Sequence, residues 1–144
     1  MNEKTLALGF DFGRRRIGVA VGGSGTGRAE PLTTIACREN QPDWNVIDSL
    51  IDEWKPTLLV VGLPYNTDGS ESDMTRASRK FAGQVQNRYR IPCKLVDERF
   101  SSLEAEDWLR EQRRGGVRRR RVKKEDIDQG AAAVILQSWL DDRK

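Results

Sequence analysis

LALGFDFGRRRIGVAVGG, residues 6–23, is the stretch of sequence that decides the expected fold. Two apolar runs are separated by a short basic turn, which predicts a hairpin of two antiparallel strands. A single carboxylate, Asp11, lies near the end of the first run. Because residues two apart share a face of a strand, Asp11 lies on one face with Ala7 and Gly9, and these small residues leave room beside it. Asp11 is therefore either a paired structural charge or a group that holds a ligand.

Strand-like and helix-like segments alternate through the rest of the chain. The run TLLVVGL is apolar on both faces, which is typical of a central parallel strand covered on both sides. A hairpin followed by alternating helices and strands predicts an α/β fold with a mixed sheet. Strands are expected at 6–12, 16–22, 31–36, 57–63 and 92–98. Helices are expected at 44–54, 72–89, about 101–113 and about 125–141.

Composition narrows the chemistry. The 144 residues are expected to form one domain, 1–144, and they include no histidine, which excludes Ser-His or Cys-His nucleophiles and histidine-ligated zinc. Carboxylates are then the natural ligands, and they suit hard cations such as Mg²⁺ and Mn²⁺. Without a signal-peptide pattern or a membrane-length apolar run, we expect a cytoplasmic protein with no membrane partner. Cys37 and Cys93 fit no metal or redox spacing and are expected to be small buried residues.

Two further carboxylates stand in unusual positions. Asp128 begins a helical stripe that continues through Ala131, Ala132 and Ile135, so it lies on the packed face of its helix. Glu98 ends the last expected strand, and a parallel strand beside the first would place that end near Asp11. Carboxylates gathered in one crevice repel each other unless a divalent cation lies between them.

A structural alternative explains the same carboxylates without a metal. Asp128 would then cap the last helix, and Asp97 or Glu98 would pair with Arg99 or with the arginines at 14–16.

The segment REQRRGGVRRRRVKK, residues 110–124, holds nine lysines or arginines and one glutamate. Its glycines predict a flexible loop at about 113–122, and such a run is often only a solvated loop. Beside an acidic crevice that acts on a polyanion, however, it would bind backbone phosphates and raise the rate of encounter. The residues expected to bind phosphate here are Arg118, Arg119, Arg120, Arg121 and Lys123.

Two other segments offer phosphate contacts. Arg14 and Arg16 follow Asp11 in the hairpin turn, and Asn66 lies in VVGLPYNTDGSES, which lacks the ending of a Walker loop. A solvated turn and a plain turn with a helix cap explain these residues equally well. The hairpin also resembles the phosphate-binding hairpin of actin-like ATPases, but those proteins need a second domain and a second hairpin, and the chain has no second copy.

The motifs GFDFGRRRIGVAVG, VVGLPYNTDGSE, LVDERFSS and DQGAAAVILQSWL together resemble the YqgF family of ribonuclease H-like proteins, described as Holliday junction resolvases or pre-16S rRNA nucleases. The resemblance implies a ribonuclease H-like fold with a five-stranded mixed sheet, order 3-2-1-4-5, and helices on both faces. It implies that Asp11, Glu98 and Asp128 form an acidic triad. Asp126 competes for the last position, but the alanine-rich run after Asp128 keeps the spacing of the motif.

The leading hypothesis is therefore an endonuclease that uses Mg²⁺ or Mn²⁺ to cleave structured RNA at the 5′ end of small-subunit rRNA, leaving a 5′-phosphate and a 3′-hydroxyl. Its expected partner is precursor rRNA or a ribosomal precursor particle, bound by a monomer or weak homodimer. Cleavage of branched DNA and a non-catalytic role in ribosome assembly are the alternatives.

Overall fold

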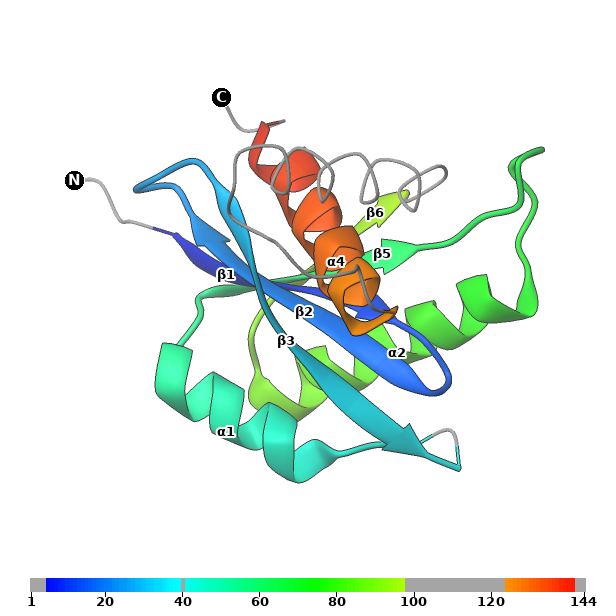
Figure 1. Ribbon diagram of the computed structural model, residues 1–144, viewed down its shortest axis with the longest axis horizontal. Coiled ribbons are helices and arrows are strands. Elements are labelled where there is room, and N and C mark those ends of the chain that lie inside the picture. The colour runs from blue at the N-terminus through cyan, green and yellow to red at the C-terminus, as the bar shows by residue number, and fades with distance from the viewer. Residues whose placement is uncertain (1–4, 40, 98–123, 142–144) are drawn as a thin grey trace.

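The computed structural model describes residues 5–39, 41–97 and 124–141, and Figure 1 shows how their elements are arranged. The expected helix at about 101–113, residues 110–123 of the basic segment, and Glu98 lie outside the described residues. The strands are β1 Leu6–Phe12, β2 Arg16–Gly23, β3 Ala29–Arg38, β4 Gln41–Pro42, β5 Leu58–Leu63 and β6 Cys93–Asp97. The helices are α1 Trp44–Trp54, α2 Asp73–Tyr89 and α4 Lys124–Asp141.

The strands form one mixed sheet in the order β4-β3-β2-β1-β5-β6. β1 pairs antiparallel with β2 and β2 with β3, whereas β5 runs parallel to both β1 and β6. The expected α/β fold is confirmed. The expected strand order 3-2-1-4-5 is confirmed as well, since the fourth and fifth expected strands are β5 and β6. The expected count of five is one strand short, because the two-residue β4 adds to the edge at β3, and two residues carry no periodicity by which a strand is recognised.

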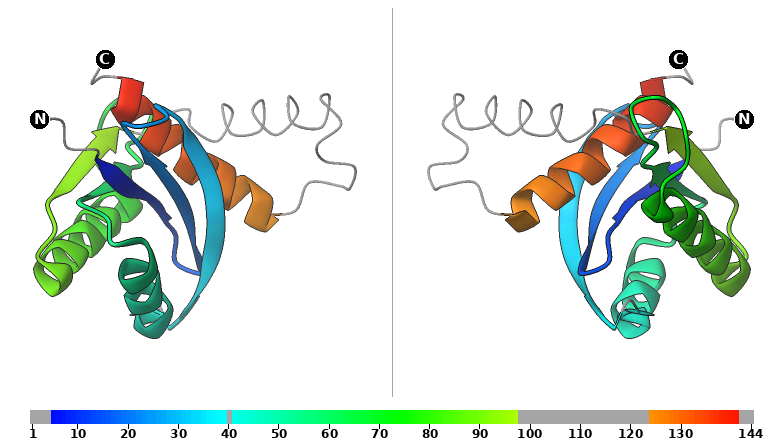
Figure 2. Two further views of the ribbon diagram at one scale, coloured as in Figure 1. Left: turned by 90° about the vertical axis from the view of Figure 1, so that its left-hand side faces the viewer. Right: turned by 90° about the vertical axis from the view of Figure 1, so that its right-hand side faces the viewer.

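Helices cover both faces of the sheet. Figures 1 and 2 show α1 and α2 on one face and α4 on the other. On the first face, large apolar side chains of the strands pack against Ile47 of α1 and against Phe81 and Val85 of α2. Phe10 meets Phe81 edge-on, and Phe12 stacks on Phe81 at 4.9 Å between ring centroids. This face carries the larger share of the apolar core.

The other face is built of small residues, which allows α4 to lie close to the strands. Ala7 and Ala20 are fully buried in a second core with Ala132 and Leu136 of α4. A Cβ added to Gly9 of β1 would lie 2.9 Å from Cβ of Leu136, which is closer than carbon atoms pack. The space left by the small residues of β1 is therefore filled by α4.

Within the described residues, no helix combines the length and apolar character needed to cross a membrane.

Candidate active site

Asp11 lies one residue before the end of β1, on the face that α4 covers. Its cross-strand partner in β2 is Gly18, and the Asp11 side chain is half-buried. Because β1, β5 and β6 are parallel, their carboxyl ends meet at this same edge of the sheet. Ligands of open α/β sheets gather at such an edge.

Asp128 reaches the same place from α4. A Cβ built on Gly18 would overlap the carbonyl oxygen of Asp128 and would lie 3.1 Å from its Cβ. The backbone of α4 thus rests directly on β2 at Gly18. Side chains of cross-strand partners point to one face with Cβ atoms about 5 Å apart, so the Cβ atoms of Asp11 and Asp128 lie on the same face, at most about 8 Å from each other. The sequence analysis missed Gly18, because its importance depends on the contact with α4, which no local pattern shows.

An ion pair joins Asp128 to β2. Nε of Arg16 donates to Oδ2 of Asp128 at 2.7 Å, with the two side chains 32% and 25% exposed. Arg16 is two residues from Gly18 and therefore shares its face. The structural alternative, in which Asp97 or Glu98 pairs with the hairpin arginines, stays a prediction, because Glu98 lies outside the described residues. The contact between Arg16 and Asp128 is one that the sequence analysis did not name. Sequence separation hid this contact, since the two residues are 112 positions apart.

A second polar contact fixes α4 over the sheet. Nε2 of Gln129 donates to Oγ1 of Thr34 on β3 at 3.0 Å. Thr34 is the cross-strand partner of Gly18, so the contact lies one strand away from the carboxylates. It holds the turn of α4 that carries Asp128, and the sequence analysis did not identify it.

The cap expected as an alternative role for Asp128 is not observed. The α4 helix begins at Lys124, so Asp128 lies inside the helix and not before its first turn. The backbone of Asp126 belongs to α4 as well, but its side chain is outside what the structure describes.

The third expected carboxylate, Glu98, follows the last described residue of β6, Asp97, and lies outside the described residues. Asp97 itself lines a surface hollow with Tyr65 and Arg79, on the side of the sheet that α2 covers. Val96 packs against the core beneath α4. In residues 5–39, 41–97 and 124–141, no three histidine, cysteine or acidic side chains form a group that would hold a metal. The described part of the triad is thus the pair Asp11 and Asp128.

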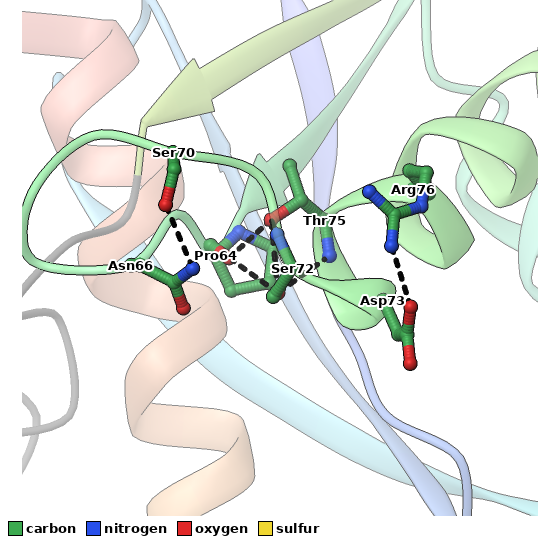
Figure 3. Close-up of polar contacts among 7 residues, drawn as sticks. All are labelled: Pro64, Asn66, Ser70, Ser72, Asp73, Thr75 and Arg76. Atoms are coloured by element: carbon green, nitrogen blue, oxygen red, sulfur yellow. Dashed lines mark hydrogen bonds and ion pairs between the residues drawn. The ribbon is translucent and has the colours of Figure 1, made fainter.

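The loop that carries Asn66 is a closed turn leading into α2 (Figure 3). Nδ2 of Asn66 donates to Oγ of Ser70 at 2.9 Å, and the backbone N–H of Ser70 donates to the Asp68 carboxylate at 2.9 Å. Ser72 and Thr75 form a capping box at the start of the helix. The plain turn with a helix cap is therefore present, and its exposed Asn66 side chain lies beyond the carboxyl end of β5.

The remaining expected site residues are basic. Arg14 is exposed in the hairpin turn between β1 and β2. Arg118, Arg119, Arg120, Arg121 and Lys123 all lie outside the described residues.

The two cysteines behave as small core-side residues. Both are free and half-buried, with Cys37 and Cys93 packed against the larger core. Burial raises the pKa of the Cys37 thiol and raises the pKa of Cys93 to about 12. A thiol with a raised pKa is a weak nucleophile, so neither cysteine is a candidate for nucleophilic catalysis.

Comparisons with known proteins agree with this arrangement. The sequence model of the RuvX family, described as Holliday junction resolvase, matches residues 5–142. A relative from Legionella pneumophila (strain Philadelphia 1) is 50% identical over 133 residues, which cover 92% of this chain and 93% of the relative. A relative from Nitrosococcus oceani is 47% identical and covers 99% of this chain and 91% of its own length. Both carry the name "Putative pre-16S rRNA nuclease".

Solved structures are similar in fold. RuvC of T. thermophilus in complex with a Holliday junction substrate has a TM-score of 0.59 at 12% identity, covering 96% of this chain and 95% of RuvC. The yeast mitochondrial Holliday junction resolvase has a TM-score of 0.53 at 11% identity, covering 93% and 77%. This likeness shows the expected ribonuclease H-like fold. Because the family model matches residues 5–142 and the two relatives align over nearly the whole chain, the chain belongs to the RuvX (YqgF) family.

Proposed function

We propose that the protein is a divalent-metal-dependent endonuclease that hydrolyses phosphodiester bonds of structured RNA, in the cytoplasmic maturation of the 5′ end of pre-16S rRNA. The observation that carries the proposal is the meeting of Asp11 and Asp128 at Gly18. The names of the relatives support the reaction and the substrate.

The residues present fit a hard divalent cation. Two carboxylates from distant parts of the chain share one face at the carboxyl edge of the sheet, and oxygen ligands suit Mg²⁺ or Mn²⁺. Asp128 already draws a cationic group to itself, the guanidinium of Arg16. We assign Asp11, Asp128 and Glu98 as the ligands. The assignment of Glu98 is supported by the motif LVDERFSS, which carries part of the resemblance to the family.

When bound, the metal ion lowers the pKa of a coordinated water and stabilises charge on the leaving oxygen. The protein supplies the positions. Gly18 lets α4 approach β2, and the bond between Gln129 and Thr34 fixes the helix there. Asp11 is held by the β1–β2 pairing. These constraints hold the carboxylates at one place before the substrate arrives.

The substrate is proposed to lie along the carboxyl edge of the sheet. Arg14 and Asn66 are exposed on loops that begin there, and both are assigned contacts with phosphate. The basic residues Arg118, Arg119, Arg120, Arg121 and Lys123 are assigned the same role. They offset the repulsion between an acidic site and a polyanion.

The test is a cleavage assay on labelled precursor rRNA with and without Mn²⁺, comparing the wild type with Asp11→Asn. We expect metal-dependent cleavage that falls at least about a hundredfold in Asp11→Asn, since loss of a ligand removes several kcal/mol of transition-state stabilisation. Asp52→Asn is the matched control, because Asp52 is exposed on α1 and α1 covers the opposite face. Cleavage by Asp11→Asn at the wild-type rate contradicts the proposal.

Cleavage of branched DNA is the second candidate, favoured by the description of the family and by the likeness to RuvC. A four-way junction included in the same assay separates the two substrates. Paired incisions in a junction need two sites a fixed distance apart, so the junction reading also requires a dimer. A protein that remains monomeric by sedimentation and cuts only RNA excludes it. Metal-independent, salt-dependent binding without cleavage of either substrate would instead indicate an assembly factor.

A further inference from the structure

The positive charge of Arg16 lies beside Asp128, the carboxylate that we propose as a metal ligand. Nε of Arg16 donates to Oδ2 of Asp128 at 2.7 Å, from the first residue of β2. We infer that Arg16 is the counter-ion of Asp128 in the metal-free protein and that a divalent ion displaces it. The inference rests on the proposed function, because it takes Asp128 as a metal ligand.

The physical reason is competition between two cations for one carboxylate. A guanidinium bonded to Oδ2 and a divalent ion coordinated by the same carboxyl group would lie only a few ångströms apart. Like charges at such a distance repel strongly where water is partly excluded. Both side chains of the pair are largely covered, with 25% of the Asp128 side chain and 32% of the Arg16 side chain exposed. The site therefore favours one cation at Asp128 at a time.

The structure gives Arg16 a way to leave. The residue stands at the junction of β2 with the hairpin turn, whose Arg14 and Arg15 are exposed. A third of the Arg16 side chain is already exposed, and arginine is long and has many rotamers. The backbone of Asp128 has no such freedom, because it is held against Gly18, and the short aspartate side chain has few rotamers. The metal ion therefore displaces the arginine, while the carboxylate stays in place.

The ion pair also has a role before metal binds. Without a cation beside it, Asp128 would be a carboxylate that is three-quarters covered, and burial disfavours an ionised carboxyl group that has no counter-charge. Arg16 supplies that counter-charge and so helps to keep α4 on the sheet. Arg16 therefore stabilises the metal-free site, and it lowers the affinity for the metal ion because the ion must displace it.

Mn²⁺ titration of the full-length protein by calorimetry tests the inference directly. Arg16→Gln removes the competing charge, and we expect it to bind Mn²⁺ about five- to tenfold more tightly than the wild type. Arg16→Lys keeps a charge beside Asp128 and is expected to stay within about twofold of the wild type. Arg15→Gln is the matched control, since it removes the same charge from the adjacent exposed position, and it is also expected to change the affinity by less than about twofold.

Thermal unfolding gives a second readout on the same variants. In EDTA, Arg16→Gln should melt below the wild type, and Mn²⁺ should raise its Tm more than it raises that of the wild type. For a variant that fails to fold, a wild-type crystal soaked in Mn²⁺ decides. The guanidinium should have left Asp128 when the ion is present, and an Arg16–Asp128 bond that persists beside a bound ion overturns the inference.

The outcomes separate this inference from the proposed function. If Asp128→Asn loses Mn²⁺ binding but Arg16→Gln binds with unchanged or weaker affinity, the competition is wrong and the metal site stands. If neither the wild type nor Arg16→Gln binds Mn²⁺, the metal site is wrong and the inference fails with it.

Discussion

Asp128 of α4 and Gly18 of β2 are in backbone contact, so close that a Cβ on the glycine would overlap the Asp128 carbonyl oxygen. Gly18 is also the cross-strand partner of Asp11. One residue without a side chain therefore decides whether two carboxylates that are remote in the chain meet. Its role is one of packing, but it determines the geometry of the site.

Replacing Gly18 with alanine should damage stability and site together. The added methyl group meets backbone that cannot rotate away, so α4 must shift from the sheet. Overpacking of this kind costs roughly 1–3 kcal/mol of unfolding free energy, measurable by urea denaturation. Mn²⁺ affinity should fall in the same variant, because Asp128 moves with α4.

Gly83 provides the matched control for that substitution. It is exposed within α2, and an added Cβ would meet nothing within 4 Å. Gly83→Ala should therefore stabilise the protein by about 0.5–1 kcal/mol through helix propensity. Equal losses from both alanine substitutions would contradict the close contact at Gly18.

A polar cluster between α1 and α2 predicts a pH dependence of stability. Asp48 accepts hydrogen bonds from Nε of Arg88 at 3.0 Å and from the hydroxyl of Tyr89 at 2.6 Å. The bond from Arg88, followed by that from Tyr89, lowers the pKa of Asp48. A carboxyl group whose pKa is lower in the folded state stabilises the fold above its unfolded pKa of about 3.9 and loses this effect as the pH falls further.

Asp48→Asn should therefore lower the Tm at pH 7, and the gap to the wild type should close as the pH falls through about 4 and below. Thermal unfolding followed by circular dichroism between pH 7 and pH 2.5 measures both curves. A gap that stays constant across this range would show that the charge of Asp48 is not involved.

The basic segment predicts the salt dependence of nucleic-acid binding. Changing Arg118, Arg119, Arg120, Arg121 and Lys123 to glutamine removes five positive charges. If all five contact phosphates, the slope of log K against log salt on duplex DNA should become shallower by about 4.5, at roughly 0.9 per contact. Fluorescence anisotropy at several salt concentrations gives the slope.

Five exposed basic residues elsewhere serve as the control for charge alone. They are Arg38, Lys55, Arg76, Lys80 and Arg90. Changing them to glutamine alters the net charge by the same amount and should leave the slope nearly unchanged. The same reduction in both variants would mean that only the overall charge matters.

Local pattern was enough to predict most of the fold. The apolar run of β1 and the i, i+3/i+4 stripe of α1 gave the observed bounds, 6–12 and 44–54. Strand β3 was expected at 31–36 and runs from Ala29 to Arg38. Proline at position 31 disguised its start, and the strand tolerates it where the pairing with β2 is irregular, at Val19 and Ala20.

The site was predicted less completely, because its decisive contacts join distant parts of the chain. Asp128 was found from its place on the helical stripe, and Asp11 from its interruption of a strand. The partner of Arg16 depends on which residue of α4 crosses β2, and no local pattern contains that information. Gly18 shows the same limit, since its significance arises only when the helix is laid over it.

The central claim is that a divalent ion binds between Asp11 and Asp128, and anomalous diffraction from an Mn²⁺-soaked crystal measures it most directly. The account predicts a manganese peak at the carboxyl edge of β1, within coordination distance of both carboxylates, roughly 2.0–2.3 Å. A crystal in which manganese binds elsewhere, with Arg16 still on Asp128 and no ion at Asp11, would contradict it.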